Sequence, residues 1–252
     1  MRLGTTSYIL PADILPNVEY LAARVDDIEL VLFEVEDGGG NLPDAPTVAR
    51  LAELAAAHDL TYTVHLPLDL RLAANDAETS ASLDKARRVF EVMGPLAPFA
   101  YVAHVEGEEL RGTPGAATVA AWQARAVRSL EIACDALDQP ELLCIENLET
   151  WDAVHLAPLL AALPVSRCID VGHFWAQGVD PVPHLRQWLP RARVVHLHGV
   201  ADRDHRSLAV TPRAQLAAVA RELEGFAGVV TLEVFGQDDF DSSWVAWHAA
   251  SR

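Results

Sequence analysis

Carboxylate and imidazole side chains recur where short apolar runs of this chain end. The run RCIDVGH carries Asp170 and His173, RVVHLHGV carries His196 and His198, and LLCIENLE carries Glu146. Imidazole and carboxylate are the ligands that Zn, Mn and Fe(II) accept in proteins. The residue types therefore indicate metal-dependent chemistry, provided that the fold brings the ends of these runs together.

The pattern extends to further runs, and each member has an ordinary interpretation when it is taken singly. The full set comprises Glu34, His65, His104, Glu146, Asp170, His173, His196, His198 and Glu233. A histidine at a strand end is often a hydrogen-bonded structural residue, a glutamate can lie on the surface, and an aspartate can cap a helix. Burying so many ionisable groups together without cations is costly, so the set favours a centre of two or three ions of Zn, Mn or Fe.

Short β-rich runs alternate with longer segments of helical periodicity. The runs are RLGTTS, IELVLFE, TYTVHLP, AYVAHVEG, LLCIENLE, RCIDVGH, RVVHLHGV and VVTLEVF. Segments such as TVARLAELAAAHDL and SLDKARRVFEVMG separate them. Eight such units predict an α/β fold, a (β/α)8 TIM barrel formed by residues 1–252 as a single domain. The carboxyl ends of barrel strands meet at one rim, where the polar side chains would converge.

The alternation of side chains along a strand indicates which members of the set point into the barrel. Side chains two positions apart on a strand face the same way, so His196 and His198 share a face and both can reach the barrel mouth. Glu146 and Asn147 are adjacent and cannot both point inward. We assign Glu146 to the interior and Asn147 to the space between strands or to the rim.

Composition limits the class of partner. The chain has 252 residues, is 51% hydrophobic and 22% charged, and carries a formal charge of −17. That charge repels polyanions, and the sequence has no basic strip to oppose it, so we expect no nucleic-acid partner. A small phosphate-bearing substrate stays compatible, because bound divalent cations can reverse the local sign.

The sequence also predicts the cellular location of the protein and the state of its cysteines. The beginning MRLGTTSYILPADIL has no signal-peptide core, and no apolar run reaches the ~18 residues of a membrane span, so we expect a soluble, cytoplasmic protein with no membrane partner. Cys134, Cys144 and Cys168 lack metal-site spacing and are expected to be reduced core residues. A homo-oligomer is compatible with the sequence.

The polar loop ADRDHRSL leaves three interpretations open. Asp202, Asp204 and His205 can complete a second or third metal position. Arg203, His205 and Arg206 can instead hold a substrate phosphate. The loop can also be an ordinary solvated segment.

In these residues the chain resembles the xylose isomerase-like TIM barrels, which include sugar isomerases, epimerases and endonuclease IV. Glu146, Asp170, His196 and Glu233 are similar to the four-ligand metal set of the isomerases. The larger trinuclear zinc set of endonuclease IV is matched less completely, by the addition of His65, His104, His173 and, from the polar loop, Asp202 or Asp204 with His205. The resemblance covers nearly the whole chain and implies the fold and the ligands, but not one reaction.

Within this group the stretches YTVHLPLDLRL, IENLE, SRCIDVGHFW, HLHGVADRDHRSL and TLEVF resemble the cobamide-remodelling phosphodiesterases. That resemblance implies hydrolysis of the nucleotide-loop phosphodiester of an adenosylated cobamide, a B12-type corrinoid, to cobinamide phosphate and a riboside for corrinoid salvage. Many isomerases carry His-x-Lys-Asp where this chain has His196-Leu197-His198-Gly199. The missing Lys and Asp weaken the isomerase interpretation.

The phosphodiesterase hypothesis gives each residue a role. Ions bridged by Glu146 and Glu233 would bind the phosphoryl oxygens, activate water and stabilise the leaving alkoxide. The expected catalytic residues are Glu146, Glu233 and Asp170. The expected metal ligands are His65, His104, Glu146, Asp170, His173, His196, Glu233 and His205. The expected substrate-binding residues are Glu34, His198, Asp202, Arg203, Trp151, Phe174 and Trp175, although the three aromatic residues can equally cover the barrel top.

Two other functions compete with this hypothesis. A sugar or sugar-phosphate isomerase or epimerase would use one metal at Glu146, Asp170, His196 and Glu233, with the two glutamates moving a proton on and off carbon. A non-catalytic metal-binding or ligand-binding barrel would load ions without turnover. One ion per chain favours the isomerase, whereas two or three favour hydrolysis.

Overall fold

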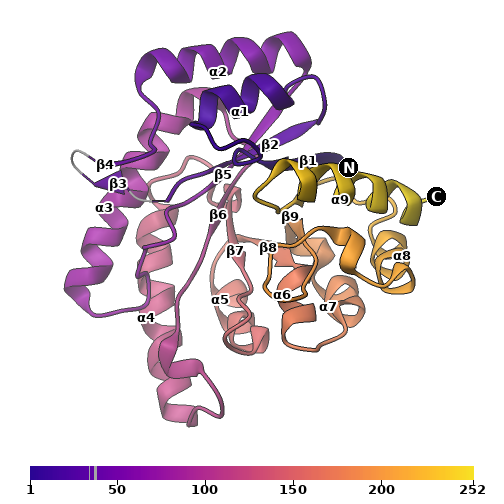
Figure 1. Cartoon of the computed structure of the whole chain (residues 1–252). Coiled ribbons are helices and arrows are strands. Elements are labelled where there is room, and N and C mark those ends of the chain that lie inside the picture. Colours follow the sequence, from indigo (N-terminus) through magenta and orange to yellow (C-terminus); the bar gives the residue numbers. More distant parts are fainter. Residues whose placement is uncertain (34, 37–38) are drawn as a thin grey trace.

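Eight parallel strands close into one barrel, which confirms the predicted (β/α)8 architecture (Figure 1). The computed structural model describes residues 1–33, 35–36 and 39–252. Around the barrel the strands are β1 (Arg2–Thr6), β2 (Asp27–Val31), β5 (Thr61–His65), β6 (Ala100–Ala103), β7 (Leu143–Glu146), β8 (Ser166–Asp170), β9 (Ala192–Leu197) and β10 (Val229–Leu232), and β10 pairs with β1. Each begins within one residue of the start of a predicted run, and the predicted runs extend one to four residues beyond the strand ends.

Helices surround the barrel, as Figure 1 shows. They are α1 (Ile14–Leu21), α2 (Ala45–His58), α3 (Asp76–Met93), α4 (Ala116–Cys134), α5 (Ala157–Ala162), α6 (Val171–Ala176), α7 (Pro181–Trp188), α8 (Arg213–Glu222) and α9 (Gln237–Ala250). Single 3-10 turns occur at Gly94–Leu96, Glu108–Leu110, Pro140–Leu142, Ala153–Leu156, Leu189–Arg191 and Leu208–Val210, and a two-stranded hairpin pairs β3 (Val35–Glu36) with β4 (Gly39–Gly40). None of the helices in the described ranges is both long and apolar enough to cross a bilayer.

Local sequence explains where several helices begin. The side chains of Asp44, Asn75 and Asp180 accept hydrogen bonds from main-chain N–H groups in the first turns of α2, α3 and α7. Those N–H groups have no partner inside the helix, so each cap stabilises its helix by about 1 kcal/mol. Pro46 and Pro181 lie in first turns, where a missing N–H costs little.

The interior of the barrel has an apolar floor beneath a polar upper layer. Ala100, Val102, Cys144, Cys168 and Val194 form a small buried cluster separate from the main core. The main core fills the space between the barrel and the helices. Cys134, Cys144 and Cys168 are all buried and free of disulfides, as expected of core residues.

Candidate metal centre

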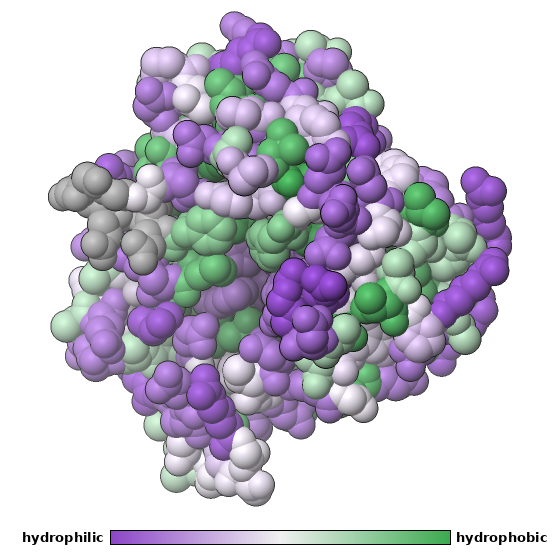
Figure 2. All heavy atoms as spheres, viewed as in Figure 1, coloured by the Kyte–Doolittle hydropathy of each residue, from purple (hydrophilic) through white to green (hydrophobic). Residues whose placement is uncertain are grey.

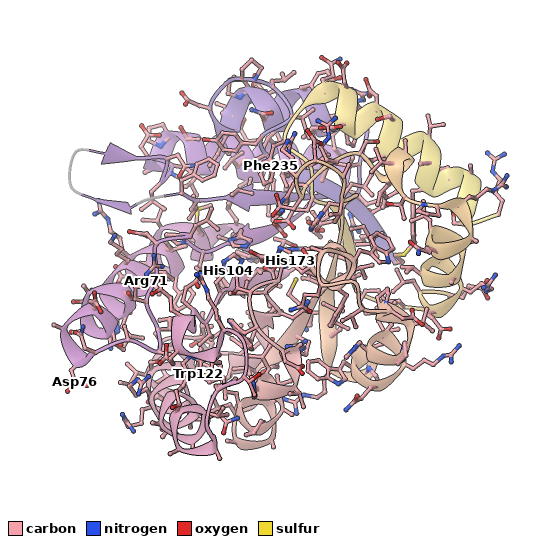
Figure 3. The ribbon with its side chains drawn as sticks, turned by 60° about the horizontal axis from the view of Figure 1, so that its bottom comes forward. Arg71, Asp76, His104, Trp122, His173 and Phe235 are labelled. Carbon is pink, nitrogen blue, oxygen red and sulfur yellow. The ribbon has the colours of Figure 1, made fainter. Side chains whose placement is uncertain are left out.

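Side chains from six consecutive strands converge above the apolar floor. The register pairs Asp170 with His196, and Glu146 with Cys168, so that polar side chains of neighbouring strands stand side by side on the inner face. Figure 3 shows His104 and His173 close together near the centre of the molecule, with Phe235 above them and Trp122 below them, on α4. His104, His173 and Phe235 line one cavity, the mouth of the barrel. The convergence that strand alternation predicted is therefore present in the fold.

The four-ligand cluster consists of Glu146, Asp170, His196 and Glu233. His196 Nδ1 lies 3.4 Å from Glu146 Oε1, 3.8 Å from Asp170 Oδ2 and 3.1 Å from Glu233 Oε2. Ligand atoms arranged tetrahedrally around an ion at ~2.1 Å are ~3.4 Å apart. The spacing therefore suits one divalent cation without rearrangement of the chain.

The two-histidine cluster consists of His65, His104 and Glu146. His65 Nε2 and His104 Nε2 lie 3.4 and 3.2 Å from Glu146 Oε2. Glu146 thus turns Oε2 to this cluster and Oε1 to His196. A carboxylate with one oxygen facing each cluster can bridge two cations.

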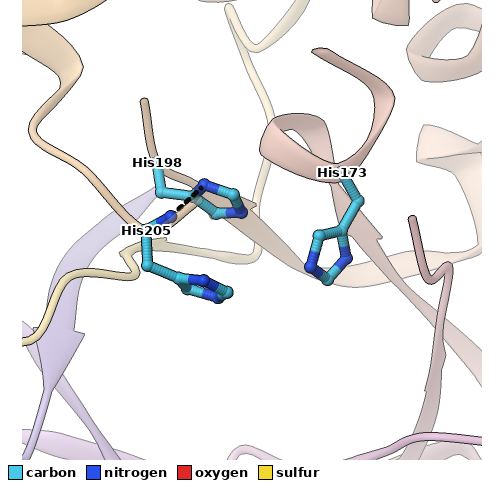
Figure 4. A group of neighbouring side chains, drawn as sticks. All are labelled: His173, His198 and His205. Atoms are coloured by element: carbon cyan, nitrogen blue, oxygen red, sulfur yellow. Dashed lines mark hydrogen bonds between the residues drawn. The ribbon is translucent and has the colours of Figure 1, made fainter. Parts of the chain in front are cut away.

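The three-histidine cluster consists of His173, His198 and His205 (Figure 4). It adjoins the four-ligand cluster, because His205 Nε2 lies 3.4 Å from Glu233 Oε2 and His198 Nε2 lies 3.3 Å from Asp170 Oδ1. His205 adopts a left-handed backbone conformation with φ of 50°, which histidine tolerates better than most residues.

Gly172 is required by the close approach of His198. A Cβ atom built on Gly172 would lie 2.2 Å from His198 Cε1, a contact that no pair of carbon atoms tolerates. The glycine in the run DVGH therefore lets the His198 ring pack against the main chain between Asp170 and His173.

Unpartnered buried atoms support the fit of these residues to cations. Within the described part of the chain, the buried atoms without a hydrogen-bond partner include both carboxylate oxygens of Glu146, Asp170 Oδ2, His196 Nδ1, His198 Nε2 and Glu233 Oε2. Buried polar atoms are nearly always satisfied, and leaving one unsatisfied costs about 1–3 kcal/mol. Their concentration at one place, facing one another, is what a multinuclear metal site requires.

Hydrogen bonds on the outer side of the rings orient most of the histidines. His65 Nδ1 lies 2.8 Å from the Leu66 carbonyl oxygen, and His173 Nδ1 lies 2.9 Å from that of Asn147. Each Nδ1–H can donate to its carbonyl, which leaves Nε2 free to bind a cation. Asn147 itself lies between strands, as predicted, where its amide bonds the main chain of Asp170.

His198 has two possible tautomers with different consequences. Its Nδ1 accepts a hydrogen bond of 3.0 Å from the His205 N–H, which puts the proton of the neutral ring on Nε2, facing Asp170. In that state His198 orients Asp170. If Nδ1–H instead donates to the Gly199 carbonyl at 3.2 Å, Nε2 is free to bind an ion.

The carboxylates and imidazoles strongly shift one another's pKa values. Burial raises the pKa of Glu146 and Glu233, but neighbouring imidazoles, first His196, outweigh it and hold both well below their usual value. Burial lowers the pKa of the histidines, but the carboxylates outweigh it and raise the pKa of His65 to about 8, of His173 to about 9 and of His205 to about 10. The centre binds protons tightly when no cation occupies it.

Cys168 reaches the same place but differs in chemistry. Its sulfur groups with ligand atoms of Glu146 and His196. Burial holds the pKa of the Cys168 thiol well above its ordinary value. The neutral thiol is consistent with a core residue beneath the centre.

The aromatic residues expected at the substrate lie elsewhere. Trp151 is 3% exposed and packs edge-on against Trp122 with ring centroids 5.2 Å apart. Phe174 is 1% exposed and stacks on His184. Trp175 lines a different cavity, of about 780 Å³, beside α7 and α8. The three rings pack against neighbouring side chains of the core and helices, and none of them lines the mouth.

The remaining expected substrate residues are dispersed. Asp202 is exposed, and its Oδ1 lies 3.4 Å from Arg206 Nε. Arg203 forms an ion pair with Asp239. Asp202 and Arg203 are both absent from the lining of the mouth. His198 is fully buried behind the ligands rather than exposed to substrate. Glu34 lies outside the described residues. Asp204 does line the mouth and lies 3.2 Å from His205 Nδ1.

The mouth is a cavity of about 330 Å³ lined by both polar and apolar side chains. Beside the ligand residues, Glu106, Arg111 and Glu149 are among the polar ones, and Leu68 and Phe235, each 39% exposed, are among the apolar ones. Leu68 also lines an adjoining cavity of about 550 Å³ together with Tyr8, Phe33, Asn41 and Arg71. Figure 2 shows apolar side chains gathered along the edge of a hollow. These residues were not expected from the sequence, because they lie in the loops beyond the strand ends, whose path the periodic pattern does not predict.

Comparisons with known proteins agree on the fold. The family model described as Xylose isomerase-like TIM barrel matches residues 22–251. A D-tagatose 3-epimerase-like protein is similar over 99% of this chain and 97% of its own, with a TM-score of 0.81 and 17% identity. Endonuclease IV from Thermus thermophilus is similar over 99% of this chain and 98% of its own, with a TM-score of 0.73 and 19% identity. The IolI protein, solved with a zinc atom, is similar over 100% and 98%, with a TM-score of 0.77 and 14% identity. No curated protein sequence matches the chain.

Proposed function

Because the chain belongs to the xylose isomerase-like TIM barrel family, we propose that its strand-end side chains hold at least two divalent cations and that it hydrolyses a phosphodiester. The observation that carries the proposal is Glu146, whose two oxygens face separate sets of imidazoles. A single-metal site uses the four-ligand cluster and leaves the two-histidine and three-histidine clusters without a role.

The chain supplies ligands, charge and shape to this reaction. Cations held at the four-ligand and two-histidine clusters would polarise the phosphoryl group and stabilise the leaving oxygen. Glu233 lies between His196 and His205, where its carboxylate can hold the attacking water or accept a proton from it. Arg111, which lines the mouth, offers a guanidinium to a phosphate oxygen.

The substrate we propose is an adenosylated cobamide, cut at its nucleotide-loop phosphodiester. The motifs at the strand ends favour this class, and the two cavities that share Leu68 give room for a substrate larger than a monosaccharide. The apolar lining residues Leu68 and Phe235 suit the non-reacting part of a corrinoid. Cations at the centre would offset the formal charge of −17.

The deciding experiment combines metal content with turnover. Protein loaded with Zn, Mn or Fe(II) is incubated with an adenosylated cobamide, and the products are separated by chromatography and identified by mass. Two or more ions per chain with cobinamide phosphate and a riboside as products, and loss of that conversion in Glu233→Ala, would support the proposal. A single ion without conversion would overturn it, and full loading without any turnover would favour a ligand-binding barrel.

A second candidate is a sugar or sugar-phosphate epimerase, favoured by the four-ligand cluster and by structural neighbours described as epimerases. Glu146 and Glu233 would then remove a proton from a substrate carbon and return one to it, and a cation held at the four-ligand cluster would polarise the neighbouring carbonyl group. Deuterium uptake from solvent by a ketose or ketose phosphate would support this reaction. It is distinguishable from hydrolysis because no phosphoester bond breaks.

The exposed apolar side chains at the mouth should contribute to the binding of a large substrate but not to that of a small one. We expect Leu68→Asp and Phe235→Asp to raise KM for the cobamide about tenfold, because each replaces apolar contact with a desolvated charge worth ~1–2 kcal/mol. Turnover of bis(4-nitrophenyl) phosphate, a diester much smaller than a cobamide, should change by less than about threefold in the same variants. Steady-state kinetics on both substrates makes the comparison, and equal losses on both would contradict the assignment.

A further inference from the structure

Glu29 lies beneath the four-ligand cluster and has no role in the functions considered above. It is in the middle of β2 and is 0% exposed. The register places it between Thr6 of β1 and Thr63 of β5. Its Oε2 lies 2.8 Å from His196 Nε2. A carboxylate buried this deeply needs a compensating partner, and the imidazole of His196 is that partner.

The two nitrogens of His196 face opposite ways. Nδ1 faces the carboxylates of the four-ligand cluster, with Glu233 Oε2 at 3.1 Å, whereas Nε2 faces Glu29. An ionised carboxylate only accepts hydrogen bonds, so Glu29 keeps the ring proton on Nε2. The lone pair of Nδ1 is then directed at the position where a cation would bind.

The other oriented histidines use weaker acceptors. The outer nitrogens of His65 and His173 lie against main-chain carbonyl oxygens. A carboxylate in the same place makes a stronger, charge-assisted hydrogen bond and raises the basicity of the coordinating nitrogen. His196 is the imidazole of the four-ligand cluster, so the stronger acceptor supports the histidine on which that cluster depends.

The carboxylate of Glu29 is incompletely compensated in the metal-free chain. Its Oε1 has no hydrogen-bond partner among the described residues. Glu29 is buried together with Glu146, Asp170 and Glu233, and these carboxylates repel one another unless protons or cations compensate. One partner, His196, does not compensate this cluster of carboxylates, and a bound cation would.

We infer that Glu29 is a positioning residue of the metal centre, which fixes the Nε2–H tautomer and the ring orientation of His196 so that Nδ1 can bind a divalent cation. The inference applies to hydrolysis and to epimerisation alike, because both would use the four-ligand cluster. It requires only that the chain binds a cation there.

The test compares Glu29→Leu, Glu29→Gln and the control Asp27→Asn. Asp27 is two residues earlier on the same face of β2 and fully buried, but its Oδ2 accepts from Thr61 Oγ1 at 2.6 Å and contacts no ligand. Zn²⁺ affinity is measured by competition with a chromophoric chelator, Co²⁺ coordination by absorption, and metal-free stability by urea denaturation.

We expect Glu29→Leu to weaken Zn²⁺ binding roughly 10–100-fold, Glu29→Gln by less than ~3-fold because its amide oxygen still accepts from Nε2–H, and Asp27→Asn not at all. The metal-free Glu29→Leu protein should lose stability, because His196 is left without its buried partner, so affinities are compared under conditions in which both proteins are folded. A residue with a merely structural role would lower stability and leave the Zn²⁺ affinity of the folded protein unchanged.

Several results would overturn the inference. Unchanged affinity in Glu29→Leu would remove the positioning role, and an equal, severe loss in Glu29→Leu and Glu29→Gln would make Glu29 a direct ligand. Nitrogen NMR of 15N-histidine-labelled, Zn²⁺-loaded wild type checks the tautomer even if Glu29→Leu fails to fold. Protonated Nε2 with metal-bound Nδ1 at His196 is required. Absence of any Zn²⁺ binding by wild type would instead reject the metal centre itself.

Discussion

Glu146→Gln should lower phosphodiester hydrolysis at least ~10³-fold, equivalent to about 4 kcal/mol of transition-state stabilisation. The substitution keeps the size of the side chain but removes its charge and replaces one of the two oxygens that face His65 and His196. An amide can offer an oxygen to one cluster only. Metal content should therefore fall by at least one ion per chain, measured by atomic emission on dialysed protein together with the cobamide assay.

A matched control separates this effect from a change in net charge. Glu141→Gln alters the charge equally at the other end of β7, where Glu141 is exposed and its carbonyl oxygen accepts from Ser166 Oγ. That variant should keep the metal content and the activity of wild type. Retention of two ions by Glu146→Gln, or activity within about tenfold of wild type, would contradict the bridging role.

Strand alternation is the reason why much of the centre could be predicted. In a closed parallel barrel, neighbouring residues on one strand face opposite sides and strand ends share a rim. Those two rules place Glu146 inside and Asn147 between strands, and they bring His196 and His198 to the same side, as the structure has them. Both rules depend only on the position of a residue within its strand and need no knowledge of which residues it contacts.

Glu29 is a residue of the centre that the strand-end pattern does not predict. It lies in the middle of β2, deeper in the barrel than the strand ends. Glu34, which the strand-end pattern did predict, is five positions later in the sequence and of the opposite alternation. An acidic residue in the middle of an otherwise apolar strand, as in DIELVLF, is itself a signal, because it must find a buried partner.

The aromatic residues show what local sequence does not contain. Trp151 and Phe174 follow strand ends, just as Phe235 does, yet the first two are buried and Phe235 is exposed at the mouth. The difference lies in contacts distant in sequence, since Trp151 packs on Trp122 of α4 and Phe174 on His184 of α7. Tertiary packing of this kind has no periodic signature.

Removal of the metal should make the stability of the protein strongly dependent on pH. The folded-state pKa values of His65, His173 and His205 are raised from 6.5 to about 8, 9 and 10. A raised histidine pKa contributes stability that is complete below the unfolded value of 6.5 and is lost as pH rises through the folded value. The metal-free chain should lose unfolding free energy on the order of several kcal/mol between about pH 6.5 and 10.

On the acid side of the profile, the stability of the metal-free protein should fall as pH falls. The pKa values of Glu146 and Glu233 are lowered well below 4.5, so their contribution is present above that value and lost as pH falls. The metal-free protein should therefore be most stable between about pH 5 and 6.5. Divalent cations compete with the same protons, so metal affinity should rise over the range in which the metal-free protein weakens.

Urea denaturation at a series of pH values, with chelator and with saturating Zn²⁺, measures both effects. The loaded protein should show little loss of stability between about pH 6.5 and 9, because its ligand histidines are already deprotonated by the cation. His205→Gln should flatten the metal-free profile, whereas His248→Gln, on α9 against the Trp244 carbonyl, should leave it unchanged. A metal-free profile that is flat or rises with pH would mean that protons do not occupy the places assigned to cations.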